Sequence, residues 1–398
     1  MAALLTIAEA QRLVLARAAP LAAETVAVAE GSGRVLAADA RAAVDLPPYD
    51  SSAMDGYALR AAETPGRLRI AARIAAGRPA ERALAAGEAM AIATGGVVPE
   101  GADAVVPVEA TSEDGDAVVV GERVEPGAFV RRRGGDVAAG EAVVAAGTRL
   151  GPAQLGALAG AGVAHVRVGG TPAVAVLSTG TELRRPGEQL TAGQIYEANS
   201  VILRGAAVEA GAEARVLDAV ADDPDAHRRA LAAALAADVV VTSGGVSVGP
   251  HDLVRPVGAD LGVEEVFWGV AVKPGKPLWF GARGATLVFG LPGNPVSALV
   301  GFHLFVRPAL LALQGHADPL PRFEPGRLAS AIRRGPRVQL VRARSRTDGD
   351  AVALEPLRGQ DSHMIARAAA ADALVLVPSG EGDVPAGAPV RYLRIGPV

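Results

Sequence analysis

The chain has 398 residues, enough for about two to four domains, and half of them are hydrophobic although aromatic residues supply only 3%. A formal charge of −4 provides no broadly basic surface, so we expect neither nucleic acid nor a membrane as a partner. The absence of cysteine excludes disulfides, thiolate catalysis and cysteine-ligated metal centres.

The first predicted element is an amphipathic helix near the N-terminus. Thr6-Ile-Ala-Glu9 fits a capping box, and Ala10 and Val14 then fall on one apolar stripe. Glu9 and Arg12 interrupt the apolar run and no basic segment precedes it, which argues against a signal peptide. No stretch approaches about 18 uninterrupted apolar residues, so we expect a cytoplasmic protein without a transmembrane helix.

Residues 59–144 consist of short β-branched runs split by glycine and proline, a pattern typical of a small β domain. The polar run at residues 50–57 before it is interpreted either as a surface loop or as part of a site. Residues 93–99 form a glycine turn that carries a hydroxyl. In residues 130–136, three arginines stand beside an aspartate, and a solvated charge run and a phosphate clamp are both open interpretations.

From Pro172 onward, predicted strands alternate with helices of about 10–14 residues, which indicates a doubly wound parallel sheet. The expected strands are 173–177, 214–219, 238–243 and 286–289, and the expected helices are 199–210, 222–236 and 295–313. In such sheets ligands bind beyond the carboxyl ends of the strands. By that rule, one edge of the sheet, at the carboxyl ends of its strands, is expected to carry Glu182, Asp222 or Asp223, and Asp252.

Lys273 and Lys276 are the only lysines in the chain, which uses arginine elsewhere. Two lysines three positions apart suggest a site that needs a compact ammonium group, although rare residues can also cluster by chance. Gly244-Gly245 follows one predicted strand, and Asn294 and Pro295 are predicted to cap and open a helix after another. Loops that offer N–H groups on both sides of two ammonium groups predict a phosphate or oxyanion cleft.

The proline-rich segment 315–326 is predicted to be a domain linker. The remainder, with apolar runs at 374–377 and 390–393, is predicted to be a small β unit. A polar loop at 359–363 precedes a short helix-like patch.

Seven motifs, in order and over essentially the whole chain, resemble the molybdopterin molybdenumtransferases of the MoeA family, which includes the E domain of gephyrin. They are Asp50-Ser-Ser-Ala-Met-Asp-Gly-Tyr-Ala58, Thr94-Gly-Gly-Val-Val-Pro-Glu-Gly-Ala-Asp103, Ser178-Thr-Gly-Thr-Glu-Leu183, Gly193-Gln-Ile-Tyr196, Thr242-Ser-Gly-Gly-Val-Ser-Val-Gly249, Lys273-Pro-Gly-Lys-Pro277 and Leu291-Pro-Gly-Asn-Pro-Val-Ser297.

The resemblance implies a multidomain α/β plus β fold. Its parts would be an elongated domain (1–45 and 140–170), an inserted β domain (46–139), a central doubly wound parallel α/β domain that binds nucleotide or pterin (171–315) and a C-terminal β barrel (316–398). It implies an enzyme that inserts molybdenum from molybdate into adenylylated molybdopterin and releases AMP, with Mg²⁺ or another divalent cation. It also implies a homodimer whose cleft is shared between subunits, and it suggests contacts with an adenylyltransferase and with recipient apoenzymes.

By motif position, the resemblance implies functional roles for particular residues. Those with catalytic roles would be Asp55, Asp136, Glu182, Asp252, Lys273 and Lys276, and the metal ligands would be Glu182, Asp222 and Asp252. The substrate-binding residues would be Thr94, Thr179, Ser243, Gly244, Gly245, Ser247, Pro292, Asn294, Pro295 and Ser362. The family pattern favours Asp222 over Asp223. Ser51, Gly135 and Thr181 stand where the family commonly has Asn, Glu and Asp, which leaves metal affinity and the choice between molybdate and tungstate open.

The residue chemistry agrees with this role. Mg²⁺ takes carboxylate oxygens and water, which an acidic rim supplies. Because the chain has no cysteine, the sulfur ligands of molybdenum would come from the pterin, and the protein would position groups and stabilise charge. Two alternatives remain: an adenylyltransferase of the same pathway, and a non-catalytic pterin-binding scaffold.

Overall fold

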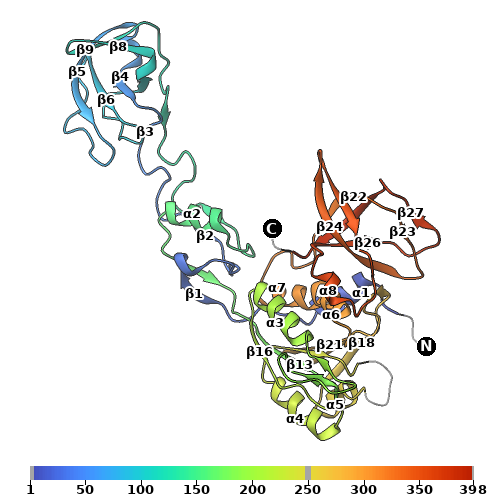
Figure 1. The fold of residues 1–398 in the computed structure, drawn as a ribbon. Coiled ribbons are helices and arrows are strands. Elements are labelled where there is room, and N and C mark those ends of the chain that lie inside the picture. Colours follow the sequence, from blue (N-terminus) through green and yellow to red (C-terminus); the bar gives the residue numbers. More distant parts are fainter. Residues whose placement is uncertain (1–3, 247–251, 397–398) are drawn as a thin grey trace.

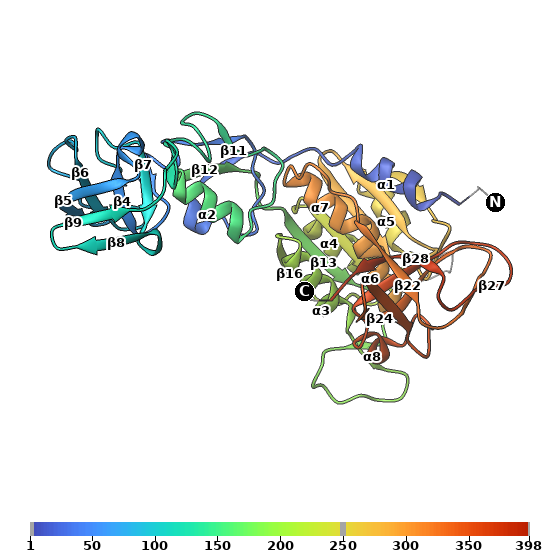
Figure 2. The same cartoon turned by 90° about the horizontal axis from the view of Figure 1, so that it is seen from above.

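The computed structural model describes residues 4–246 and 252–396, and its overall shape is elongated (Figures 1 and 2). The inserted β domain lies at one end, a small domain follows it, and the α/β domain and the C-terminal barrel form the other end. The chain passes out to the inserted domain and back again, so the small domain is built from two separate segments.

This small elongated domain pairs the outgoing and returning segments. Strand β1 (Glu24–Ala27) is antiparallel to β12 (His165–Val168), and β2 (Ala40–Arg41) is antiparallel to β11 (Ala142–Val144). Helix α2 (Pro152–Gly160) and the 3-10 turn η1 (Val28–Glu30) cover them. Their shared core includes Val28, Leu36, Leu150 and Leu158, so neither segment forms this domain alone.

Helix α1 (Ile7–Leu15) begins with the predicted capping box, because Thr6 accepts from the Glu9 N–H while the Glu9 side chain accepts from the Thr6 N–H. Its apolar stripe does not face the elongated domain. Ala10 and Val14 are fully buried in the core that holds the helices following the α/β sheet. Residues 1–45 were expected in the elongated domain, but helix α1 packs on the α/β domain because its partner there is a large apolar surface.

The inserted domain is a six-stranded sheet in the order β7-β4-β6-β5-β9-β8, and the prediction of a β domain is confirmed. The strands are β4 (Gly56–Leu59), β5 (Gly66–Ile74), β6 (Glu88–Ile92), β7 (Ala104–Pro107), β8 (Thr111–Asp114) and β9 (Ala117–Val120), with 3-10 turns η2 (Ala61–Glu63) and η3 (Val108–Ala110). A short pair, β3 (Ser51–Ser52) and β10 (Val130–Arg131), joins the two chain segments that enter and leave the domain. Two apolar clusters fill the two faces of the sheet.

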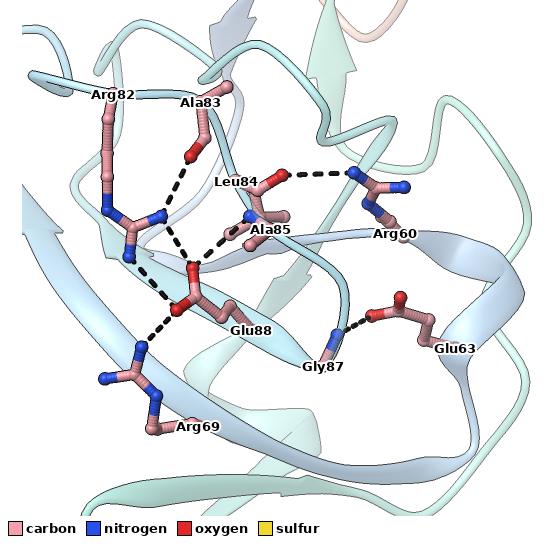
Figure 3. Close-up of polar contacts among 9 residues, drawn as sticks. All are labelled: Arg60, Glu63, Arg69, Arg82, Ala83, Leu84, Ala85, Gly87 and Glu88. Carbon is pink, nitrogen blue, oxygen red and sulfur yellow. Dashed lines mark hydrogen bonds and ion pairs between the residues drawn. The ribbon is translucent and has the colours of Figure 1, made fainter.

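A buried carboxylate fixes the loop between β5 and β6 (Figure 3). Glu88 is 7% exposed and pairs with both Arg69 and Arg82, and it also accepts from the Ala85 N–H. Hydrogen bonding to Arg82, together with the nearby charges, lowers the pKa of Glu88 to about 2. The network is therefore held by an ionised carboxylate at neutral pH.

The α/β domain contains a six-stranded sheet in the order β16-β13-β17-β21-β20-β18. Strands β13 (Ala173–Ser178), β16 (Glu213–Val216), β17 (Val239–Ser243) and β21 (Thr286–Leu291) are parallel, as predicted. Strands β20 (Trp279–Arg283) and β18 (Glu264–Trp268) add an antiparallel edge that the sequence pattern did not predict. Helices α3 (Asn199–Glu209), α4 (Pro224–Ala234) and α5 (Val254–Asp260) connect the strands.

The predicted helix 295–313 is continuous and consists of α6 (Pro295–Gly301), a π-helical turn η4 (Phe302–Val306) and α7 (Arg307–Leu313). Among the described residues it is the one helix long and apolar enough to cross a membrane. Because 83% of the most apolar 18-residue stretch of this helix is buried inside the protein, we interpret it as a helix of the protein core.

The C-terminal domain is a closed barrel of five strands, ordered β24-β25-β22-β28-β26 and closed by the pairing of β26 with β24. Its strands are β22 (Phe323–Leu328), β24 (Val338–Asp348), β25 (Ala351–Pro356), β26 (Ala373–Val377) and β28 (Pro389–Arg394). The short strand β19 (Val272–Lys273) joins β24 from the α/β domain, and β23 (Ile332–Arg333) pairs with β27 (Asp383–Val384). Helix α8 (Ile365–Ala368) and the pair β14 (Leu183–Arg184) and β15 (Ile195–Tyr196) complete the fold. The expected multidomain fold class is confirmed.

Candidate functional site

The site in the α/β domain lies at the carboxyl ends of β13 and β17. The chain leaves β13 outward to β16 and returns to β17 on the other side, so these two strands form the topological switch point of the sheet. Buried Thr179 follows β13 and its N–H donates to the Ser243 carbonyl at 3.0 Å. The two loops that begin here are therefore tied to each other at their origins.

Asn199 connects this edge to the loop after β21. Its Nδ2 donates to the Ser243 hydroxyl at 2.7 Å and to the Gly293 carbonyl at 2.6 Å. The Ser243 hydroxyl in turn donates to the Pro292 carbonyl at 3.3 Å. From the sequence, Asn199 was expected only as the first residue of a helix, whereas in the structure it bridges the loops that follow β17 and β21.

The predicted glycine turn is required by close packing. Gly244 has φ +92° and Gly245 has φ +67°, and a Cβ on Gly244 would lie 2.7 Å from the Thr179 carbonyl oxygen. The Gly244 N–H already donates to the Leu291 carbonyl at 3.0 Å. The expectation that this N–H faces an anion is therefore wrong for Gly244, which shapes the turn instead. Ser247 lies outside the described residues.

The start of α6 differs from prediction in one respect. Asn294 occupies the N-cap position and Pro295 is the first helical residue, but the Asn294 side chain makes no capping hydrogen bond. The next N–H, of Val296, donates to the Ser362 carbonyl at 3.0 Å. A loop of the barrel thus sits on the helix N-terminus and places Ser362 at the start of α6, while its predicted role in substrate binding stays a prediction.

That barrel loop is held by Arg342, which sequence reasoning missed. Its side chain is 1% exposed and donates to the carbonyls of Gly359, Asp361 and Met364 and to the Gln360 side chain. A buried guanidinium surrounded by four acceptors of one loop acts as its scaffold. In the sequence the residue is one arginine among many, so no local signal marks it.

Lys273 ends β19 and Lys276 lies in the loop that follows it, and both residues are exposed. Among the described residues, neither ammonium group lies within ion-pair distance of a carboxylate. Gly275, between them, has φ +106°, and its Cβ position would lie 3.7 Å from the Ser297 carbonyl oxygen in the first turn of α6. The two lysines therefore flank a loop packed against the same helix start that meets the barrel.

The predicted carboxylates of this domain sit on separate loops. Glu182 is exposed after β13, and the Thr181 hydroxyl beside it donates to Asp222 Oδ2 at 3.1 Å. Asp223 caps α4 by accepting from the Ala226 N–H at 2.8 Å. Since Asp223 is used by the helix, the structure favours Asp222 as the rim carboxylate.

Asp252 is half-buried two residues before α5. Within residues 4–246 and 252–396, no group of three or more His, Asp or Glu side chains is arranged to hold a metal ion. Mg²⁺ commonly takes only one or two protein carboxylates and completes its shell with water and substrate phosphates.

The remaining predicted residues lie in or next to the inserted domain. Asp55 Oδ1 accepts from the Thr94 N–H at 2.6 Å and from the Thr94 hydroxyl at 2.8 Å, and both residues are exposed. The backbone hydrogen bond from Thr94, with its hydroxyl, lowers the pKa of Asp55 from its ordinary value. Asp136 is also exposed, and its N–H donates to the Leu46 carbonyl. Within one chain, the inserted domain lies at the opposite end of the molecule from the α/β domain that carries the lysine loop (Figures 1 and 2).

The arginine run beside Asp136 has a structural role. Arg132 pairs with Asp50, and the backbone N–H of Arg133 donates to the same carboxylate. The Arg133 side chain pairs with Asp45. These contacts tie together the two segments that enter and leave the inserted domain. They favour neither a solvated charge run nor a phosphate clamp. Of the three arginines of this run, the exposed Arg131 alone makes no ion pair with a described residue.

Comparisons with known proteins agree with this architecture over its whole length. Residues 5–162 match the MoeA N-terminal region (domain I and II), residues 175–312 match a probable molybdopterin binding domain, and residues 325–395 match the MoeA C-terminal region (domain IV). Molybdopterin molybdenumtransferase 2 of Mycobacterium tuberculosis is 40% identical over 400 residues, with 96% of this chain and 97% of that protein covered. The molybdopterin molybdenumtransferase of Bacillus subtilis is 32% identical, with 94% and 90% covered.

Solved structures show the same relationship. The molybdopterin biosynthesis MoeA protein of Pyrococcus horikoshii OT3 superposes with a TM-score of 0.86 at 29% identity, covering 99% of this chain and all of that one. A second structure from Pyrococcus horikoshii gives a TM-score of 0.80 at 32% identity, with 98% and 99% covered. The chain therefore belongs to the MoeA family of molybdopterin molybdenumtransferases and has a transferase role in molybdenum cofactor biosynthesis.

Proposed function

We propose that this chain inserts molybdenum from molybdate into adenylylated molybdopterin and releases AMP, acting in the cytoplasm as a homodimer. The observation that carries the proposal is the loop from Lys273 to Lys276, whose two exposed ammonium groups make no ion pair in the described chain. It packs at the start of α6, next to the loops that follow the switch-point strands. Unpaired cations beside this edge suit an anionic nucleotide–pterin and an oxyanion.

The chain's own residues would act by positioning and charge stabilisation. Lys273 and Lys276 would hold phosphate and molybdate oxygens as compact cations. Thr179, Ser243 and the Asn199 bridge would keep the loops after β13, β17 and β21 in one arrangement. Glu182, Asp222 and Asp252 would supply carboxylates for Mg²⁺, which when bound would polarise the phosphoanhydride.

A shared site explains the position of the inserted domain. Asp55, Thr94 and Asp136 are exposed, and they lie in or next to the inserted domain, which is at the opposite end of the molecule from the α/β domain that carries the lysine loop (Figure 1). In a homodimer they would complete the cleft of the other subunit. The resemblance on which this rests covers both halves of the cleft.

The direct test incubates the protein with adenylylated molybdopterin, Mg²⁺ and either molybdate or tungstate, and measures AMP release. Lys276→Ala and Asp55→Ala are each expected to reduce molybdenum insertion roughly tenfold or more with circular dichroism unchanged. Full activity in both variants would refute the site. ATP consumption without molybdate would instead support an adenylyltransferase, and tight pterin binding without turnover would support a scaffold.

Mixing the two variants tests whether the site is shared. After subunit exchange, about half of the dimers would be mixed, and one of the two clefts in each would be intact, so activity should recover to about a quarter of wild type. A mixture of two independently prepared Lys276→Ala samples is the matched control and should recover nothing. No recovery in the Asp55→Ala and Lys276→Ala mixture, despite demonstrated exchange, would contradict a shared cleft.

A further inference from the structure

A second polar cavity of about 540 Å³ lies away from the strand ends, where three domains meet. The elongated domain contributes Gly147, Thr148 and Arg149, the helix 295–313 contributes one face, and the segment 316–322 and the barrel close the remainder. The Ala317 N–H donates to the Gly147 carbonyl at 3.0 Å, so the walls are in direct contact. The cavity is therefore part of the fold and not a gap between loose domains.

One face of the core helix lines this cavity with polar side chains. His303, Arg307 and Leu311 are spaced by four residues and so project from the same side. His303 belongs to the π-helical turn Phe302–Val306, and such turns often mark functional sites. A histidine and an arginine on an otherwise apolar helix face are expected to have hydrogen-bond or ion-pair partners.

Neither side chain has one in the described part of the chain. His303 is 9% exposed and makes no hydrogen bond there, and the half-buried Arg307 makes neither a hydrogen bond nor an ion pair. Burial, followed by the charge of Arg307, lowers the pKa of His303 to about 4, so the ring is neutral near pH 7. Burial and the charge of the neighbouring Arg149 lower the pKa of Arg307, while the nearby carboxylate of Glu209 opposes this shift. Because Glu209 makes no ion pair with Arg307 in the described chain, the half-buried guanidinium has no direct partner, which is costly unless something binds it.

The charges around the cavity leave a small positive excess. Arg394 is paired with Glu324. The other charged groups that line it are Arg149, Arg307 and Arg322 against Glu209 and Asp318, three cations and two carboxylates. The Arg149 side chain donates to the backbone carbonyls of Gly33 and Glu209, so its guanidinium charge is not neutralised by those bonds.

We propose that this cavity is a second anion site, which binds a small oxyanion between Arg307 and Arg149 with an N–H of neutral His303 as a further donor. A planar guanidinium suits the paired oxygens of a phosphate or a related tetrahedral anion. The site is distinct from the proposed cleft: His303 follows Asn294 by nine residues, roughly 14 Å along the same helix. Free phosphate, sulfate and molybdate share the required chemistry.

The test is a calorimetric titration with inorganic phosphate, repeated with sulfate and molybdate to distinguish the sources. It uses the full-length Lys276→Ala protein, so that anion binding at the lysine loop does not obscure the second site. Adding Arg307→Gln should weaken phosphate binding at least tenfold. Arg204→Gln removes one positive charge from the exposed side of α3, five residues before Glu209, and is the matched control that should leave binding unchanged.

A second variant distinguishes loss of the anion site from loss of the fold. Glu209→Gln removes a competing carboxylate beside Arg307 and should tighten phosphate binding by a factor of about two to five, which a damaged fold cannot do. The absence of saturable phosphate binding in the Lys276→Ala protein, or unchanged affinity in both Arg307→Gln and Glu209→Gln, would overturn the proposal. AMP release is measured separately with Arg307→Gln in the otherwise unchanged chain, and normal AMP release there would show that failure of this second site leaves the proposed function intact.

Discussion

The α/β domain and the inserted domain present their candidate residues in different ways. At the sheet edge, long-range contacts set the geometry: Asn199 joins two loops that start 48 residues apart, β17 ending at Ser243 and β21 ending at Leu291, and a barrel loop docks on α6. In the inserted domain, Thr94 is the one described residue that hydrogen-bonds the Asp55 carboxylate. One half of the proposed cleft therefore depends on domain packing, whereas the other depends on a single turn.

The difference also concerns how each region is stabilised. The α/β core is continuous with α1 and with barrel residues such as Leu340 and Leu393. The inserted domain has its own apolar clusters and its own ion network around Glu88. Changes in one region should therefore leave the other unaffected, and three variants test this independence.

The largest effect is expected for Arg342→Met. Removing the guanidinium leaves the carbonyls of the 359–364 loop without their donor, which should cost about 2–4 kcal/mol in local stability and displace Ser362. Hydrogen exchange should rise in the loop and not in the inserted domain. Arg344→Met, two residues along the same strand but exposed, is the control and should have little effect. Unchanged exchange in the loop would show that the barrel contact does not depend on Arg342.

Glu88→Gln should destabilise only the inserted domain, in a pH-dependent manner. The pKa of Glu88 is lowered in the folded protein from 4.5 to about 2, so its contribution is complete above about pH 4.5 and is lost as the pH falls through about 2. The variant should therefore show faster exchange in peptides from β5 and β6 at pH 7, with the difference from wild type vanishing near pH 2. Glu100→Gln, an exposed residue of the same domain, is the control.

The smallest effect is expected for Thr94→Val, which removes one of the two hydrogen bonds to Asp55 and keeps the backbone bond. The pKa of Asp55 should rise towards its ordinary value, because a donor to the ionised form is lost. Molybdenum insertion should fall roughly twofold to fivefold. Nuclear magnetic resonance titration of the carboxyl group provides the measurement, and an unchanged pKa would show that the Thr94 N–H alone sets it.

Much of the fold follows from local patterns. The alternation of apolar strands with capped helices predicted the parallel core, and the capping box at Thr6 predicted the first residue of α1. Local patterns could not show which surface α1 would cover, because an apolar stripe specifies that a partner exists and not which one. The antiparallel strands β20 and β18 were missed because the order of apolar and polar residues in Trp279–Arg283 does not indicate whether a strand runs parallel or antiparallel to its neighbour.

The same division applies to the candidate site. Lys273 and Lys276 were visible in the sequence because they are the only lysines, and the glycine turn was visible because only glycine tolerates its backbone angles. Arg342 and Asn199 were not, since their importance comes from partners 17–22 and 44–94 residues away. Asn294 is the N-cap residue of α6 as predicted, but its side chain makes no capping hydrogen bond, and a barrel loop accepts the hydrogen bond from the Val296 N–H.

By itself, the order of residues determined the fold class, the strand-end placement of the loops and the family, since these depend on local backbone preferences, hydrophobic period and short motifs. Only the tertiary structure decided which N–H groups were already bonded, which carboxylate caps a helix and that Arg307 makes no hydrogen bond or ion pair with a described residue. The physical reason is that hydrogen bonding and desolvation depend on which atoms meet in space, and contacts between distant segments are not encoded in any one stretch of chain.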